Sequence, residues 1–172
     1  MVTSNGTVVS LVGDSSAEVL KGLAALRNVE AVEFAAAGAS ELVSRISRSH
    51  ASYFVSDADP LLHVAAAWVE FYDDLVSLET LSLEAETAAA ALQSGATVMP
   101  DYYLVLEPET VEGTWRHWWF GALARKAPTR VLPVPGSTAQ VRALLRQLPT
   151  GRPWGELAAW LRGLPYVVPD TV

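Results

Sequence analysis

The stretch DYYLVLEPETVEGTWRHWWFGALARKAPTRVLPVPG, residues 101–136, decides the fold class. Tyr102 to Leu106 and Arg130 to Val134 are short, mostly apolar runs of the kind found in parallel strands buried on both faces. Between them, Val111 to Lys126 carries aromatic and apolar side chains at spacings of three and four residues, which is typical of a helix that packs one face on a sheet. The stretch therefore predicts a unit of strand, helix and parallel strand.

The rest of the chain repeats this alternation. The further strands are expected at Thr7 to Val12, Val29 to Phe34 and Ser52 to Ser56, and a long helical region from Leu61 to Leu92 is expected to break near residues 73–77. The pattern predicts a three-layer, doubly wound α/β sandwich with a mainly parallel five-stranded sheet, Rossmann-like or flavodoxin-like. We expect one domain over residues 1–172, with an irregular tail from about residue 165. The strand order stays open; if it is 2-1-3-4-5, strands one, three and four are neighbours, and Asp14, Asp57, Asp59 and Glu107 converge on one edge.

Charge and composition exclude several classes of protein. The formal net charge of −7 argues against nucleic acid as a partner, because phosphate backbones are bound by clustered Lys and Arg. The chain has no cysteine, which excludes disulfides and thiolate metal sites. Neither a signal peptide nor a membrane-spanning run is recognisable, so the cytoplasm is the expected location and no membrane contact is expected.

Small and polar residues follow the predicted strands. In an open parallel sheet, ligands bind beyond the carboxyl ends of the strands, near the point where the strand order reverses. These loops predict a site for a small phosphate-containing ligand, with the candidate ligand-binding residues Gly13, Asp14, Ser15, Ser16, Glu107, Gly136 and Ser137.

Three aspartates in these loops suggest a metal site. Asp14 follows the first strand, and Asp57 and Asp59 follow the third. Carboxylates gathered at one edge repel one another, and a bound Mg²⁺ relieves that repulsion by taking oxygen ligands. An acidic residue after one strand, here Asp14, and an Asp-x-Asp after a later strand, here in the string YFVSDADP, resemble the carboxylate arrangement of Toprim domains. Those domains carry a glutamate directly before the glycine, where this chain has Val12. The resemblance implies magnesium-dependent chemistry on a phosphodiester.

Ser15 has two readings. With Glu18 three residues on, it fits a capping box that begins a helix, a purely structural role. The string VVSLVGDS also resembles the first block of the GDS-type esterases, which implies that Ser15 is a nucleophile. Those enzymes carry an aspartate and histidine pair near the C-terminus, whereas the histidines here are His50, His63 and His117.

The tryptophans predict a contact with a partner. The chain has six, and Trp115, Trp118 and Trp119 with Phe120 span more of the helix circumference than one sheet face can cover. A ring left uncovered, with Trp68 on the long helical region, is expected to lie at an interface, most simply that of a homodimer.

Three functions remain open from the sequence. The first is a ligand-binding or protein-interaction domain without a complete catalytic set. The second is a magnesium-dependent enzyme that acts on a phosphate or nucleotide at the carboxyl-end edge of the sheet. The third is a subunit of an oligomeric assembly. The sequence does not identify the substrate, the partner or the pathway.

Overall fold

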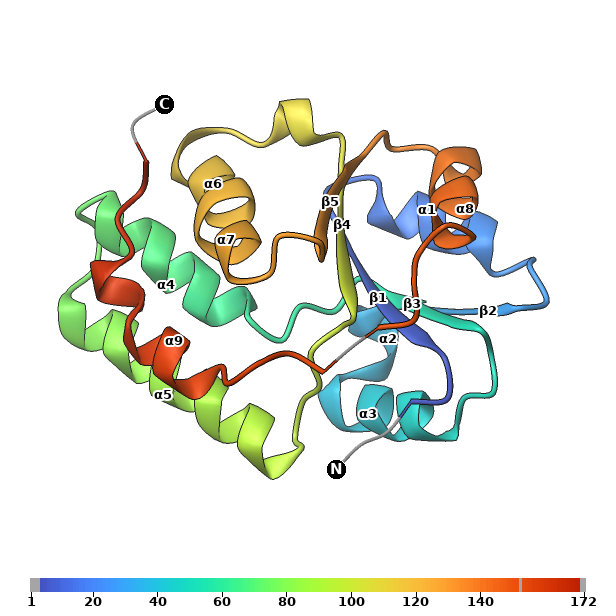
Figure 1. The fold of residues 1–172 in the computed structure, drawn as a ribbon, viewed down its shortest axis with the longest axis horizontal. Coiled ribbons are helices and arrows are strands. Elements are labelled where there is room, and N and C mark those ends of the chain that lie inside the picture. The colour runs from blue at the N-terminus through green and yellow to red at the C-terminus, as the bar shows by residue number, and fades with distance from the viewer. Residues whose placement is uncertain (1–3, 152, 171–172) are drawn as a thin grey trace.

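The structure, a computed structural model, describes residues 4–151 and 153–170 and has three layers built on one parallel sheet (Figure 1). The strands are β1 (Thr7–Val12), β2 (Val29–Val32), β3 (Tyr53–Ser56), β4 (Tyr102–Leu106) and β5 (Val131–Val134). Every neighbouring pair is parallel, in the order β2-β3-β1-β4-β5. The α/β fold and parallel sheet agree with the sequence-based prediction, and β2 is an edge strand, as expected.

The order 2-1-3-4-5 considered above is not the one adopted, because β3 lies between β2 and β1, although β1 does neighbour both β3 and β4. The chain crosses from β1 to the far edge of the sheet and returns one position, which leaves β1 between β3 and β4. The connections that leave the neighbouring strands β1 and β4 therefore run toward opposite edges of the sheet, so the order reverses between these two strands. In a sheet of this kind the crevice for a ligand opens where the order reverses.

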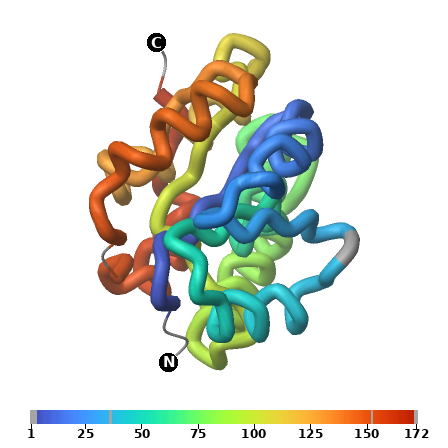
Figure 2. Tube along the Cα trace, turned by 90° about the vertical axis from the view of Figure 1, so that its right-hand side faces the viewer, coloured from blue at the N-terminus to red at the C-terminus, as the bar shows by residue number. Residues whose placement is uncertain are grey.

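Helices α1 (Ser16–Leu23) and α8 (Thr138–Leu145) cover one face of the sheet. Their buried side chains, such as Leu20 and Val141, form one core with inward-facing strand residues such as Val9 and Leu104. Figure 2 looks from the right-hand side of Figure 1, with these two helices toward the viewer and the green α4 and α5 behind.

The other face carries a thicker layer. The elements packed there are α3 (Ala39–Arg48), α4 (Leu62–Tyr72), α5 (Leu78–Ser94), α6 (Gly113–His117), the π-helical segment η2 (Trp118–Leu123) and α9 (Ala158–Arg162). Short elements connect them: α2 (Phe34–Ala37), η1 (Pro108–Thr110), α7 (Ala124–Lys126) and η3 (Leu164–Tyr166). The break expected near residues 73–77 separates α4 from α5. The helix expected from Val111 to Lys126 starts at Gly113 instead and changes to a π-helix at Trp118.

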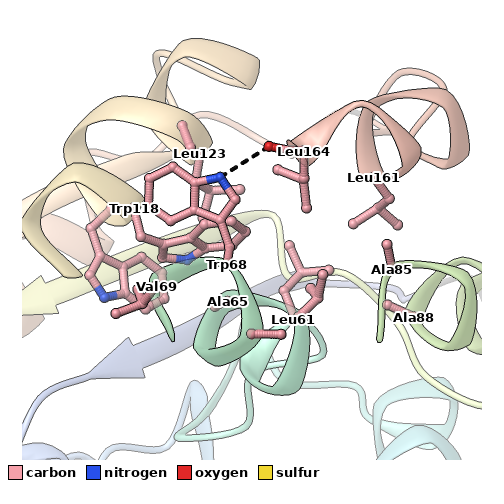
Figure 3. Close-up of a cluster of buried hydrophobic side chains, with 14 of the residues drawn as sticks. Leu61, Ala65, Trp68, Val69, Ala85, Ala88, Trp118, Leu123, Leu161 and Leu164 are labelled. Carbon is pink, nitrogen blue, oxygen red and sulfur yellow. Dashed lines mark hydrogen bonds between the residues drawn. The ribbon is translucent and has the colours of Figure 1, made fainter. Parts of the chain in front are cut away.

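Tryptophan side chains fill the core of this thicker layer (Figure 3). Trp68 and Trp118 are fully buried, with ring centroids 5.6 Å apart, and Trp119 is 4% exposed. The indole N–H of Trp68 donates to the carbonyl oxygens of Leu164 at 3.2 Å and Val167 at 3.1 Å, so the C-terminal segment lies over the rings.

This packing corrects the expected tryptophan interface. Trp68, Trp118 and Trp119 offer no surface to a partner, because α9 and η3 supply the cover that the sequence analysis assigned to a second chain. Trp115 alone of the four predicted interface residues is only partly buried. The homodimer itself stays a prediction.

Candidate functional site

The loops after β1, β4 and β5 leave the sheet at the same level. Val12 is the register partner of Val105, and Leu106 is that of Val134, so the residues that follow these pairs meet at one edge. The main-chain N–H of Glu107 also donates to the Val134 carbonyl at 2.9 Å. We call this edge the rim and define it by Gly13, Asp14, Ser15, Ser16, Glu107, Gly136 and Ser137.

Gly13 brings the loop after β1 against β4. Its φ is +125°, and a Cβ atom there would lie 3.1 Å from the carbonyl oxygen of Leu106. Only glycine adopts this conformation readily, and only glycine allows so close an approach. The Gly13 carbonyl accepts from the Ser16 N–H at 3.2 Å and from the Ser16 hydroxyl at 2.7 Å, which closes the turn into α1.

Ser15 does not cap α1. Within the described part of the chain its side chain makes no capping hydrogen bond, so the predicted capping box with Glu18 is wrong. The Ser15 hydroxyl donates instead to Oε2 of Glu107 at 2.9 Å, across the gap between β1 and β4. The local preference for a cap is overridden by an acceptor 92 residues further along the chain.

Glu107 has a strained main chain. Its φ of +48° and ψ of +58° place it in the left-handed region, which costs a residue with a Cβ on the order of 1 kcal/mol or more. Its carbonyl accepts from the N–H and the hydroxyl of Thr110, both at 2.8 Å, which holds the turn. Gly136 lies against the side chain, because a Cβ there would come within 2.7 Å of Glu107 Cγ and Oε1. The chain thus aims one carboxylate at Ser15 from a fixed and strained position.

The remaining rim residues have simpler surroundings. Ser137 caps α8, since its hydroxyl accepts from the Gln140 N–H at 3.3 Å. Asp14 is exposed at the tip of the loop, and Ser16 is buried beneath it. The predicted ligand-binding residues therefore divide into a central pair, Ser15 and Glu107, and supporting residues around it.

Asp57 and Asp59 do not join the rim. Strand β3 ends at Ser56, which is level with Ser10, whereas β1 continues for two more residues, or about 7 Å. Oδ1 of Asp57 accepts from the Phe34 N–H at 2.6 Å, beside the edge strand β2. The side chain of Asp59 lies against β4 instead, where it accepts from the Tyr103 hydroxyl.

The predicted magnesium set is therefore not assembled in this structure. Asp14 is exposed at the tip of its loop, Asp57 accepts from the Phe34 N–H, and Asp59 accepts from Leu61 and Tyr103. In residues 4–151 and 153–170, no group of three or more histidine, aspartate or glutamate side chains is placed to hold a metal ion.

A row of buried polar side chains anchors the loop after β3. Ser10 is the register partner of both Ser56 and Tyr103, so the three side chains cross the sheet in one line. The Ser10 hydroxyl donates to the Ala58 carbonyl, and the Ser56 hydroxyl accepts from the Ala58 N–H at 3.4 Å. The Tyr103 hydroxyl donates to Oδ1 of Asp59 at 2.9 Å. This row was not predicted, although the serine within the apolar run TVVSLV is a sign of it in the sequence.

Burial dominates the electrostatics of Asp59. It raises the pKa of this carboxyl from 3.8 to about 6, against the opposing effects of the Leu61 N–H, the Tyr103 hydroxyl and the charge of His63. Oδ1 accepts both hydrogen bonds, with the Leu61 N–H at 2.8 Å. Oδ2 is buried and has no hydrogen-bond partner among the described residues. Burial and the carboxylate together raise the pKa of Tyr103 well above its usual value, so this hydroxyl stays a donor.

A cavity of about 1150 Å³ opens at the opposite, amino-end edge of the sheet. Its lining includes Met99, Asp101 and Trp154. Oδ2 of Asp101 already accepts from the Val8 N–H at 2.8 Å, and the Arg130 guanidinium stacks on the Trp154 ring at 5.0 Å. Asp101 and Arg130 are thus engaged within the fold, so size alone does not make this cavity the better functional candidate.

No protein-family model, curated protein or solved structure matches this chain. Function therefore has to be argued from the site and not from the fold, since one fold serves many activities. Across the described residues, no helix is long and apolar enough to cross a membrane.

Proposed function

We propose that this chain is a ligand-binding domain that takes a small phosphate-containing molecule at the rim, between β1 and β4. The observation that carries the proposal is the hydrogen bond from Ser15 to Glu107. It withdraws a side chain from the N-terminus of α1 and holds a carboxylate beside it, at the point where the sheet order reverses.

The phosphate belongs at the start of α1. The first N–H groups of a helix have no partner within the helix and carry a partial positive charge, so they bind anions. In α5 and α8 a serine side chain occupies this position, since Ser77 accepts from the Thr80 N–H and Ser137 from the Gln140 N–H. At α1 the corresponding serine is engaged elsewhere, which leaves room for a ligand oxygen.

The carboxylate of Glu107 suits a different part of the same ligand. An ionised carboxylate accepts hydrogen bonds and repels phosphate, so it favours a hydroxyl group on the ligand. Such a hydroxyl can replace that of Ser15 on Oε2. A phosphate joined to a hydroxyl-bearing sugar, as in a sugar phosphate or a nucleotide, meets both requirements.

We favour binding over catalysis because the Ser15 hydroxyl is held by a carboxylate and not by an imidazole. His50 and His63 are exposed on other segments, and His117 lies on α6. The resemblance to GDS-type esterases therefore supplies a serine without the base that would activate it.

Thermal melting with a set of related probes tests this function. AMP and ribose 5-phosphate at millimolar concentration are expected to raise the melting temperature by mass action, whereas adenosine and inorganic phosphate, each with half of the features, raise it less. Glu107→Gln is expected to weaken AMP binding by roughly tenfold, the value of one charge-assisted hydrogen bond. Glu109→Gln, an exposed carboxylate two residues away, is the matched control. The proposal fails if no phosphate-bearing probe shifts the melting temperature or if both variants bind AMP equally.

A further inference from the structure

Asp59 connects three parts of the fold. It lies in the loop that carries the chain from β3 over β1 to α4. Its Oδ1 accepts from the Leu61 N–H at the start of α4 and from the Tyr103 hydroxyl on β4. Leu61 is fully buried and belongs to the core cluster that holds Trp68 and Trp118 (Figure 3). One carboxyl therefore connects the start of α4 to β4.

The second oxygen of this carboxyl makes the ionised form of Asp59 unfavourable. Oδ2 is buried with no hydrogen-bond partner among the described residues. A charged carboxylate in that position is poorly solvated, and a proton removes most of the cost. The two hydrogen bonds to Oδ1 and the charge of His63 offset only part of that cost.

The groups that face Asp59 are known from each packed element. β4 contributes Tyr103, a neutral donor already bonded to Oδ1, and β1 contributes the neutral Ser10 beneath the loop. α4 contributes His63, whose charge lowers the pKa of Asp59 but whose side chain is exposed. The π-helix contributes Trp119, whose ring lies 5.4 Å from that of Tyr103 and carries no charge.

We propose that Asp59 is a proton-controlled latch, which holds residues 57–61 closed on Tyr103 when the carboxyl carries a proton and loosens the start of α4 when the proton is lost. The latch segment is defined as residues 57–61. This inference is independent of the ligand site at the rim, since it concerns the face of the sheet that α4 covers.

The direction of the effect follows from linkage. Burial raises the pKa of Asp59 to about 6 in the closed state, whereas a carboxyl released into solvent returns to 3.8. The closed state therefore binds the proton more tightly. Between these two values, each unit of rising pH increases the ratio of open to closed segment about tenfold.

Hydrogen exchange of individual amides tests the latch. The reporter amides are those of Leu61, Leu62 and Ala65, which bond to Asp59 Oδ1, the Asp59 carbonyl and the Leu61 carbonyl. After correction for intrinsic exchange, their protection is expected to fall roughly 50-fold from pH 4 to pH 7. The Val141 amide, at the corresponding place in α8, is expected to change far less.

Two variants separate the latch from a general effect of pH. Asp59→Asn, which cannot ionise, is expected to abolish the pH dependence at the reporter amides. Asp57→Asn, the matched change two residues away, is expected to keep it, because Asp57 bonds to Phe34 and not to α4.

A direct titration keeps the proposal decidable if Asp59→Asn does not fold. The carboxyl carbon resonance of Asp59 in the native protein is expected to titrate with a midpoint near 6. A midpoint near 4, or reporter amides whose protection does not change between pH 4 and pH 7, would overturn the latch.

Discussion

Two acidic residues at strand ends have opposite surroundings in this molecule. Glu107 follows β4 directly, in a strained left-handed conformation, and its carboxylate reaches across the rim to Ser15. Asp59 comes three residues after β3, and its carboxylate is buried against Tyr103. The sequence suggests one acidic edge for both, whereas the structure places them in different layers.

Strand length causes the difference. β4 and β1 run to the rim, so the residue after β4 meets the loop after β1. β3 stops level with Ser10, and its loop has to pass over β1 to reach α4, which presses Asp59 onto the sheet face. In this sheet, the carboxylate of Glu107 follows the longer strand and faces the crevice, whereas that of Asp59 follows the shorter strand and packs on the sheet face.

The first prediction compares the partners of the two carboxylates by deletion. Tyr103→Ala is expected to lower the free energy of unfolding by about 3–5 kcal/mol, because it empties a fully buried position and removes the donor to Asp59. Ser15→Ala, which removes the donor to Glu107, is expected to cost less than about 1.5 kcal/mol. Urea denaturation of both variants at pH 7 measures the difference. Equal losses would mean that the rim is as much a part of the core as the loop after β3.

The second prediction concerns the dependence of stability on pH. Because the pKa of Asp59 is raised in the folded state, its contribution to stability is fully present below 3.8 and is lost as the pH rises through about 6. Relative to Asp59→Asn, the native protein is expected to lose up to about 3 kcal/mol between pH 4 and pH 7. Urea denaturation over a pH series measures this for both proteins.

Asp101 provides a control for the second prediction. Burial raises its pKa in the same direction, but this carboxyl is less deeply buried and lies near Arg130. Asp101→Asn is expected to change the pH dependence in the same sense and by less. If Asp59→Asn and the native protein follow parallel curves, then Asp59 is solvated in the folded state and the contrast with Glu107 disappears.

Local patterns were sufficient to predict the layers of the fold. Apolar runs such as Tyr102 to Leu106 mark buried strands, and residues 73–77, where the helical pattern is interrupted, mark the break between α4 and α5. The order of the strands does not follow from such patterns. Right-handed crossovers allow β3 to return to either side of β1, and the choice depends on packing between distant segments.

The candidate site was predicted in part for the same reason. Glycine and acidic residues at strand ends pointed to Gly13 and Glu107, but Ser15 was assigned to a local cap, because its true partner is remote in sequence. The tryptophans were assigned to a partner because the cover that residues 158–166 provide could not be placed from periodicity. Both predictions were wrong because the true contacts join segments that are distant in sequence.

The third prediction uses the strain at Glu107. Glu107→Gly removes the Cβ penalty of the left-handed conformation, which is worth about 1 kcal/mol, but it also removes the acceptor of the Ser15 hydroxyl, so the free energy of unfolding is expected to change by less than about 1 kcal/mol. The same variant is expected to weaken AMP binding at the rim.

Asp74→Gly is the matched control for the third prediction. Asp74 has a φ of +59° in the turn between α4 and α5, away from the rim, so the substitution relieves similar strain. It is expected to stabilise the protein without any change in AMP affinity. A loss of more than about 1.5 kcal/mol in Glu107→Gly alone would exceed the value of the Ser15 hydrogen bond and would show that its side chain holds the fold and is not kept for a ligand.

The last prediction concerns Gly136, which gives Glu107 its place. Gly136→Ala is expected to change the free energy of unfolding by less than about 1 kcal/mol, because the new methyl group meets the flexible end of a glutamate and not the main chain. The glutamate has to move, however, since Cγ and Oε1 would lie only 2.7 Å from the added Cβ. Its hydrogen bond from Ser15 is then lost, and AMP is expected to bind several-fold more weakly. Gly155→Ala, where a Cβ would meet nothing within 4 Å, is the control and is expected to leave AMP binding unchanged. If Gly136→Ala binds AMP as tightly as the native protein, AMP binding does not depend on where Glu107 points. Glu107 is then no more a ligand-binding residue than the buried Asp59.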